Sequence, residues 1–333
     1  MQVAVVGSGS WGTALAKTLG DKGHEVWLWG VDAQQIDDLR VHHENRRYLP
    51  GALLPASVQA TTDLGQALSG SKVVVAVVPS HAMREVMTRA APLLDEDALV
   101  VSASKGIENG TLQTMDELLG EVLPAPVGRR LVFLSGPSFA REVGRRLPTA
   151  VVVASLDETA ALLAQQVFAA DRFRVYTSHD VVGVELGGAL KNVMAIGAGI
   201  ADGLGFGHNT RAALITRGLA EISRLAVRRG ANPMTLAGLA GMGDLVLTCT
   251  GDLSRNRAVG LKLGEGKTRE QALAEMDQVA EGVRTTVSAR DLGRKVGVDM
   301  PITEMVYSIL YEDKPAAQGV AELLTRPHKH ELD

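Results

Sequence analysis

Cysteine is nearly absent from this sequence, in which Cys249 is the single example among 333 residues. One cysteine excludes a disulfide within the chain and any metal site built from several cysteines, and it is typical of a reducing compartment. The strand-like run at residues 2–6 follows the first residue directly, with no basic region and cleavable apolar core before it. We therefore expect a cytoplasmic protein without a bound metal.

A charge excess and long apolar runs are missing as well. Lys and Arg number 34 against 38 Asp and Glu, so the formal net charge is only -4. Such a chain lacks the broad basic surface that nucleic acids require, and any phosphate must be bound by a few local cations and backbone amides. The longest dense apolar run, residues 73–78, is far shorter than the roughly 20 residues of a membrane helix. We expect neither a nucleic-acid partner nor a membrane span.

What remains is the composition of a globular protein long enough for two domains, with 46% hydrophobic and 22% charged residues. Up to about residue 180, short β-branched runs alternate with helical stretches, a pattern that predicts a parallel sheet built by crossovers. Several of these runs are wholly apolar, as in strands buried on both faces. The expected strands are residues 3–6, 26–29, 73–77, 99–102, 131–134, 151–154 and 174–176.

The second half has almost no strand-like runs and carries Ala, Leu, Gly and Met at helical spacing. Asn232-Pro233 and Met300-Pro301 are typical helix starts, and residues 326–330 form a polar tail. The predicted fold class is α/β, with an N-terminal doubly wound Rossmann-type domain (1–180) and a mostly α-helical C-terminal domain (181–333) for substrate binding and catalysis. Because the helical half is so apolar, we expect a homodimer.

A dinucleotide site is predicted at the first strand. The sequence Gly7-Ser8-Gly9-Ser10-Trp11-Gly12 fits G-x-G-x-x-G, with a strand pattern before it and a helical stretch after it. In that context Gly7 permits the tight turn, Gly9 lets the backbone approach phosphates, and Gly12 allows close helix packing. The pyrophosphate would lie at the helix N-terminus. A glycine turn without a ligand is the alternative.

The choice between NAD and NADP is normally made at the end of the second strand. Asp32 lies there and favours NAD, whereas Arg40, Arg46 and Arg47 further along could reach a 2′-phosphate if the loop folds back. The alternative is that Asp32 only caps a helix. The sequence leaves the choice between NAD and NADP open.

Residues 181–201 are rich in Ala, Gly and Val, and their only charged members are Glu185 and Lys191. Burying an unpaired ammonium costs several kcal/mol and lowers its pKa toward neutrality, where it can exchange a proton. On this composition alone, a lysine that extends its ammonium to solvent is the simpler interpretation. Lys191 is thus a candidate acid/base that needs support from elsewhere in the chain.

Three loops supply that support. Lys105 and Gly136 each follow a predicted strand, and ligands of open α/β sheets gather at the carboxyl ends of strands. Ser254-Arg255-Asn256-Arg257 fits a helix start at which a phosphate would meet free amides and a guanidinium together. The alternatives are plain connections for the first two loops and a solvated basic turn for the third.

Taken together, these segments resemble bacterial-type NAD(P)-dependent glycerol-3-phosphate dehydrogenases, in the same order and from residue 1 to about 312. Gly-Gly-Ala-Leu-Lys-Asn (187–192) and Ser-Arg-Asn-Arg (254–257) are specific to that family. The matching segments are residues 7–12, 77–81, 104–106, 134–140, 185–193, 241–245, 254–257 and 281–282.

The resemblance implies roles for individual residues. Lys191 matches the family's proton donor and acceptor, with Lys105 and Asp244 as its catalytic neighbours. The implied substrate contacts are Lys105, Gly136, Ser138, Lys191, Asn192, Asp244, Thr248, Ser254, Arg255 and Asn256. The expected cofactor-side residues are Gly7, Gly9, Ser10, Trp11, Gly12, Asp32, Tyr48, Lys105, Ala140, Arg255, Val279 and Glu281. Cys249 is interpreted as packing, because hydride transfer needs no thiol intermediate.

The expected function is therefore the reversible reduction of dihydroxyacetone phosphate to sn-glycerol 3-phosphate with NADH or NADPH, which in this family supplies phospholipid synthesis. Family members often carry a basic residue where this chain has Val31 or Asp32, so the resemblance does not fix the cofactor. Two alternatives remain: a 3-hydroxyacid or sugar-acid dehydrogenase of similar build, and a non-catalytic nicotinamide-binding regulator.

Overall fold

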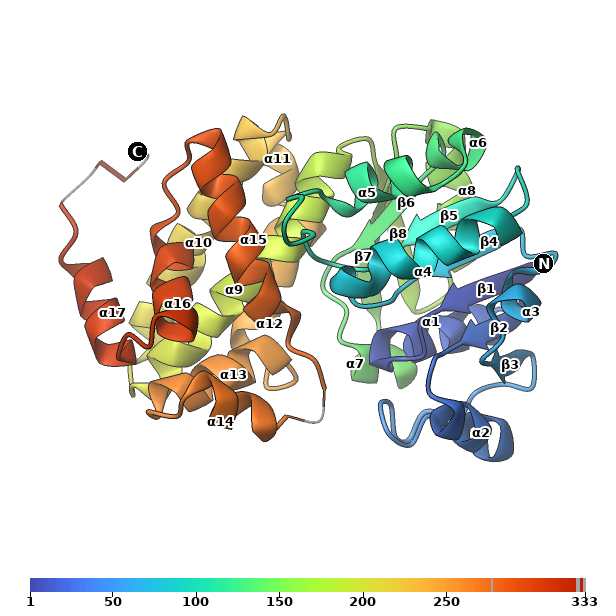
Figure 1. The fold of residues 1–333 in the computed structure, drawn as a ribbon, viewed down its shortest axis with the longest axis horizontal. Helices are drawn as coiled ribbons and strands as arrows, with labels where there is room; N and C mark the ends of the chain where they lie inside the picture. The colour runs from blue at the N-terminus through green and yellow to red at the C-terminus, as the bar shows by residue number, and fades with distance from the viewer. Residues whose placement is uncertain (277, 328–329, 332–333) are drawn as a thin grey trace.

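A computed structural model describes residues 1–276, 278–327 and 330–331 of the chain. An eight-stranded sheet forms the N-terminal half, and a bundle of helices forms the C-terminal half beside it (Figure 1). The strand order is β3-β2-β1-β4-β5-β6-β7-β8. The strands are β1 Gln2–Val6, β2 Glu25–Trp29, β3 Val58–Thr61, β4 Val73–Ala76, β5 Leu99–Ser102, β6 Val132–Ser135, β7 Thr149–Ala154 and β8 Phe173–Ser178.

Helices cover both faces of the sheet, which confirms the predicted fold class. Val3 and Val5 of β1 pack into the core on one face, and Ala4 and Val6 pack into the core on the other. This explains why several of the strands, such as β4, are almost entirely apolar. The helices of this half are α1 Ser10–Asp21, α2 Ala33–His42, α3 Leu64–Leu68, α4 Met83–Ala90, α5 Met115–Val122, α6 Ala125–Gly128, α7 Ala140–Gly144 and α8 Glu158–Phe168.

Two features of the sheet differ from the sequence-based expectation. β3 was not predicted, because Val58-Gln59-Ala60-Thr61 is short and mixes polar with apolar residues. β7 runs antiparallel to β6, so the sheet is mainly rather than wholly parallel. The remaining expected strands are present within a few residues of their predicted bounds.

The C-terminal half is helical, as predicted, and is built around the long helix α9 (Val181–Gly203). α9 is long and apolar enough to cross a membrane, as is the bent pair Pro233–Thr250 with Arg255–Gly264. However, 89% of the most apolar window of α9 is buried inside the protein, as in a core helix. The other helices are α10 His208–Arg228, α11 Pro233–Leu236, α12 Asp244–Thr250, α13 Arg255–Gly264, α14 Arg269–Ala274, α15 Glu281–Val296, α16 Pro301–Tyr311 and α17 Ala316–Leu324.

Several helices start where the sequence indicates. Asn232 caps α11 with its side chain, Ser254 caps α13, and Pro301 occupies the first turn of α16. A π-helical turn, η3 (Leu239–Gly243), runs directly into α12. In the expected polar tail, residues 328 and 329 lie outside the described part of the chain.

α9 and α13 approach each other closely through glycines. A Cβ at Gly199 of α9 would overlap the carbonyl oxygen of Arg257, and one at Gly260 of α13 would overlap that of Ile196. The two helices therefore meet backbone to backbone. This contact holds the start of α13 close to the middle of α9.

The two halves are also joined by polar contacts at α5. Glu185 of α9 accepts hydrogen bonds of 3.1 and 3.3 Å from the backbone N–H of Asp116, in the first turn of α5. Arg229, after α10, lies 2.6 Å from Glu117 of the same helix. These contacts hold α9 and the end of α10 against the sheet half.

Candidate functional site

The glycine-rich turn forms a cradle at the N-terminus of α1. Gly7 has a φ of 129°, and a Cβ at Gly12 would overlap the carbonyl oxygen of Gly7. No described atom lies within 4 Å of a Cβ built on Gly9, which precedes α1 and cannot cap it with a side chain. Backbone amides at the start of this helix therefore border open space, as a pyrophosphate requires.

Ser10 and Trp11 each add a polar side-chain group to the cradle. Ser10 Oγ donates a 2.9 Å hydrogen bond to Gln278 Oε1, which also lies 3.3 Å from Arg255 Nη1. The indole N–H of Trp11 is buried without a hydrogen-bonding partner among the described residues. Sequence reasoning missed Gln278, and its one signal was its position next to the expected Val279.

Lys191 is buried in the middle of α9, with only 9% of its side chain exposed. Its ammonium pairs with Asp244 Oδ1 and donates a 3.0 Å hydrogen bond to Thr248 Oγ1. The simpler interpretation, an ammonium that extends to solvent, is wrong. Asp244 and Thr248 lie on α12, more than 50 positions along the chain, and they satisfy the ammonium inside the protein.

A second ammonium completes the charged cluster. Lys105, from the loop after β5, lies 2.6 Å from Asp244 Oδ2 and 3.2 Å from the carbonyl oxygen of Gly136, after β6. Asp244 thus accepts from Lys191 with one oxygen and from Lys105 with the other. The structure brings together the three residues predicted to be catalytic, which come from both halves of the molecule.

The electrostatics favour proton exchange at Lys191. Burial is the main cause that lowers the pKa of Lys191; Asp244 opposes it, Lys105 adds to it, and the pKa falls to about 8. Burial alone would raise the pKa of Asp244, but Lys105 and Lys191 outweigh it and lower that pKa. Lys191 can therefore exchange its proton close to neutral pH while the carboxylate of Asp244 stays ionised.

Cys249 lies next to Thr248 and is fully buried. Burial raises the pKa of its thiol to about 12, so it is not a nucleophile at neutral pH. This agrees with its interpretation as a packing residue.

Polar groups surround the cluster. Ser138 Oγ donates a 3.0 Å hydrogen bond to the carbonyl oxygen of Gly136. Asn256 Nδ2 donates a 2.9 Å bond to Asn192 Oδ1, which places the first turn of α13 against the residue that follows Lys191. Ser254 caps α13 through the N–H of Arg257, and the exposed Arg255 lies on its first turn.

The expected cofactor-side residues lie around the cradle and along the facing loop. Ala140 begins α7 and packs, with Trp11, against the core on the α1 face of the sheet. Glu281 begins α15 and accepts a 3.3 Å hydrogen bond from the backbone N–H of Ser80 in the sheet half. Val279 is 48% exposed. Tyr48 is half-buried and lies beside Arg47.

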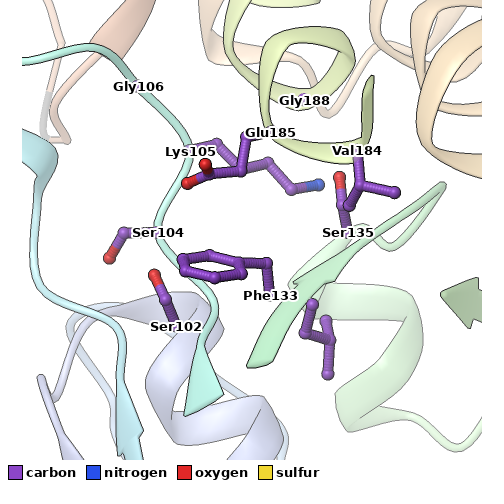
Figure 2. Close-up of a pocket in the computed structure, with 10 residues that line it drawn as sticks. Ser102, Ser104, Lys105, Gly106, Phe133, Ser135, Val184, Glu185 and Gly188 are labelled. Atoms are coloured by element: carbon purple, nitrogen blue, oxygen red, sulfur yellow. The ribbon is translucent and has the colours of Figure 1, made fainter. Parts of the chain in front are cut away.

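A small cavity lies behind Lys105, between the sheet and α9 (Figure 2). Ser102, Ser135 and Glu185 line it, and it has room for about one water molecule. The hydroxyls of Ser102 and Ser135 are buried without hydrogen-bonding partners among the described residues. Burial is the main cause that raises the pKa of Glu185 well above its ordinary value. Sequence reasoning noted Glu185 as a charge in an apolar helix but gave it no role.

Metal ligation finds no support in the described residues, which contain no group of three or more His, Cys, Asp or Glu side chains able to hold an ion.

Family models cover nearly the whole chain. Residues 2–161 match the model described as NAD-dependent glycerol-3-phosphate dehydrogenase N-terminus, and residues 180–321 match the corresponding C-terminus. Among curated proteins, a glycerol-3-phosphate dehydrogenase [NAD(P)+] of Geobacter metallireducens is 58% identical over 330 residues, 99% of this chain and 98% of its own. One of the same name from Myxococcus xanthus is 55% identical over 332 residues, 100% and 99% of the two chains.

Solved structures agree with these relatives. The crystal structure of glycerol-3-phosphate dehydrogenase from Coxiella burnetii has a TM-score of 0.93 at 42% identity, over 98% of this chain and 99% of its own. A ketopantoate reductase family member from Ralstonia eutropha has a TM-score of 0.62 at 17% identity, over 96% and 100% of the two chains. The second likeness is one of fold alone.

Proposed function

We propose that this chain, which belongs to the NAD-dependent glycerol-3-phosphate dehydrogenase family, reversibly reduces dihydroxyacetone phosphate to sn-glycerol 3-phosphate with NADH or NADPH. The observation that carries this proposal is the buried triad of Lys191, Asp244 and Lys105. It lies between the helical half and the carboxyl ends of the strands, where open α/β sheets bind ligands. The product would supply glycerophospholipid synthesis.

Lys191 is proposed to be the proton donor and acceptor. During reduction its ammonium gives a proton to the ketone oxygen at C2 while the hydride arrives at C2, and during oxidation the neutral amine takes that proton back. A pKa of about 8 supports both roles, because both forms are populated near neutral pH. Asp244 orients the ammonium, and Lys105 adds positive charge where the oxygen becomes negative.

The substrate phosphate is proposed to bind at the start of α13. Free amides, the dipole of this ten-residue helix and the guanidinium of Arg255 act there in the same direction. The phosphate lies close to the triad because Asn256 is bonded to Asn192, next to Lys191. The proposed substrate residues are Lys105, Gly136, Ser138, Lys191, Asn192, Asp244, Thr248, Ser254, Arg255 and Asn256.

The nicotinamide cofactor supplies the hydride when bound, and the cradle fits it. The open space beside Gly9 and the indole N–H of Trp11, to which no described residue is hydrogen-bonded, support a dinucleotide at the N-terminus of α1. The proposed cofactor residues are Gly7, Gly9, Ser10, Trp11, Gly12, Asp32, Tyr48, Lys105, Ala140, Arg255, Val279 and Glu281.

The same proposal covers the organisation of the protein. We propose a dinucleotide-binding domain of residues 1–180 and a substrate and catalytic domain of residues 181–333, supported by the end of β8 at Ser178 and the start of α9 at Val181. We also propose a cytoplasmic homodimer. Size-exclusion chromatography with light scattering tests the dimer, because it measures the mass of the protein as it leaves the column.

The two alternatives are not favoured. A phosphate site would have no use in a dehydrogenase of unphosphorylated acids, and the likeness to such enzymes is one of fold alone. A non-catalytic regulator would not need an ammonium buried against a carboxylate at the site, since that arrangement costs desolvation.

The test is to follow the absorbance of NADH and of NADPH with dihydroxyacetone phosphate added to the purified chain. Loss of the reduced-cofactor band with the phosphate ester, and not with ketopantoate or dihydroxyacetone, is the expected result. Absence of any loss with either cofactor would refute the proposed function.

A further inference from the structure

Asp32 lies where β2 ends and α2 begins, the position at which a dinucleotide-binding sheet distinguishes NAD from NADP. Its Oδ1 accepts a 3.1 Å hydrogen bond from the N–H of Gln35 and so caps α2. Its Oδ2 lies 2.9 Å from Nη1 of Arg47. Because different oxygens make the cap and the ion pair, Arg47 can leave Asp32 without uncapping the helix.

The three arginines that follow α2 or lie within it differ in what they contact. Arg40 donates a 2.8 Å hydrogen bond to the carbonyl oxygen of Ala60, and Arg46 pairs with Asp38. Arg47 instead pairs with Asp32, and its guanidinium carbon lies 5.1 Å from the centre of the Tyr48 ring. Of these three, Arg47 is therefore the one that the loop brings to the end of β2.

The ion pair between Asp32 and Arg47 is easily exchanged. The side chains are 39% and 60% exposed, and ion pairs between such exposed groups are weak. A phosphate ester offers a guanidinium two charge-assisted hydrogen bonds in a planar arrangement, which is stronger than a single bond to a carboxylate oxygen. A 2′-phosphate at this position can therefore replace Asp32 as the partner of the Arg47 guanidinium.

We propose that Asp32 and Arg47 together determine cofactor choice and allow this chain to use both NADH and NADPH, an inference that rests on the proposed function. With NADH, Asp32 accepts a hydrogen bond from the ribose hydroxyl while Arg47 stays paired with it. With NADPH, Arg47 turns to the 2′-phosphate and offsets the repulsion between that phosphate and Asp32. Neither residue suffices for this, because the carboxylate alone would reject NADPH and the guanidinium alone would favour it.

The experiment measures dissociation constants of NADH and NADPH by calorimetry, without substrate, on the full chain and on two variants. Arg47→Gln should weaken NADPH by at least about 10-fold and leave NADH within about 2-fold, because it removes a charged hydrogen-bond donor to the 2′-phosphate alone. Asp32→Asn should shift the ratio of the two dissociation constants by about 10-fold in favour of NADPH, since it removes the charge that repels the 2′-phosphate. Asparagine caps helices as well as aspartate does, so this variant keeps α2.

Two variants serve as matched controls. Arg46→Gln removes the neighbouring arginine, and Asp63→Asn alters the equivalent cap of α3 at the end of β3, where the side chain accepts from Gln66. Both should leave the ratio of the two dissociation constants unchanged. An Arg47→Gln variant that weakens both cofactors equally, or neither, would overturn the inference. A chain that binds neither cofactor before any substitution would instead overturn the proposed function itself.

Discussion

At the scale of the residue, the proposed chemistry depends on one carboxylate shared by two ammoniums. The ion pair with Asp244 stabilises the buried ammonium of Lys191, while burial and Lys105 lower the pKa of Lys191 to about 8. A neutral partner in place of Asp244 would leave two buried like charges close together, which costs several kcal/mol. In the triad, Asp244 therefore favours the protonated form of Lys191, and burial and Lys105 favour loss of its proton.

Replacement of Lys191 tests this directly. Lys191→Ala should lower turnover of dihydroxyacetone phosphate by about 100-fold to 10,000-fold, the usual contribution of a general acid. Cofactor binding should be unchanged, because the cradle lies on α1. Lys314→Ala, which removes a partly exposed lysine paired with Glu322, is the control. Activity that survived in Lys191→Ala would show that the proton comes from elsewhere.

Arg255 tests the phosphate site. Arg255→Ala should raise the KM for dihydroxyacetone phosphate by at least about 10-fold, because a charge-assisted contact to the phosphate is lost. Arg294→Ala, at an exposed arginine paired with Glu304 near the end of α15, should not change KM. An unchanged KM in Arg255→Ala would contradict the assignment of the phosphate to the start of α13.

At the scale of the element, the close approach of α9 and α13 sets the distance between Lys191 and the phosphate site. Glycines on both helices let the backbones meet, and a methyl group there has no space. By contrast, a methyl group added at Gly120 within α5 would have no described atom within 4 Å. The two kinds of helical glycine should respond oppositely to alanine.

Gly199→Ala should destabilise the protein by about 1–3 kcal/mol or more, because overpacking forces the helices apart. Gly120→Ala should stabilise it by about 0.5–1 kcal/mol, since alanine loses less backbone entropy in a helix. Denaturant unfolding of both variants measures the difference. Equal changes in the two free energies of unfolding would contradict the backbone contact between α9 and α13.

The sequence predicts these elements well where the signal is local. Asn232, Ser254 and Pro301 mark helix starts because capping depends on the next few residues. β3 was not predicted, because its short run of mixed polar and apolar residues has no such signal. The antiparallel direction of β7 was not predicted either, because it depends on the pairing with β6 rather than on the residues of β7. The burial of Lys191 likewise required Asp244, whose proximity is a property of the fold.

At the scale of the whole molecule, the site exists only where the two halves meet. Lys105 and the glycine turn come from the sheet half, while Lys191, Asp244 and Arg255 come from the helical half. Contacts across the junction, such as Gln278 with Ser10 and Glu185 with α5, carried no local signal and were not predicted from sequence. The resemblance to the family was enough to predict the three residues of the triad. The contacts that join the two halves around the triad could be found only in the folded structure.

Replacement of Glu185 tests the contact between α9 and α5 that joins the two halves. Glu185→Ala should lower the free energy of unfolding by about 1–3 kcal/mol, because the N–H of Asp116 loses its acceptor at a partly buried position. Amides in the first turn of α5 should then exchange with deuterium faster than in the parent chain. Glu158→Ala, in the first turn of α8, is the control. Unchanged exchange in α5 would show that Glu185 does not hold the two halves together.

The central claim, that a buried Lys191 with a lowered pKa transfers the proton, is tested most directly by the pH dependence of kcat for dihydroxyacetone phosphate reduction. Reduction needs the ammonium, so kcat should fall as the pH rises through about 8, and oxidation of glycerol 3-phosphate should show the opposite trend. A kcat for reduction that stays constant up to pH values near the ordinary lysine pKa of about 10.4 would contradict the claim.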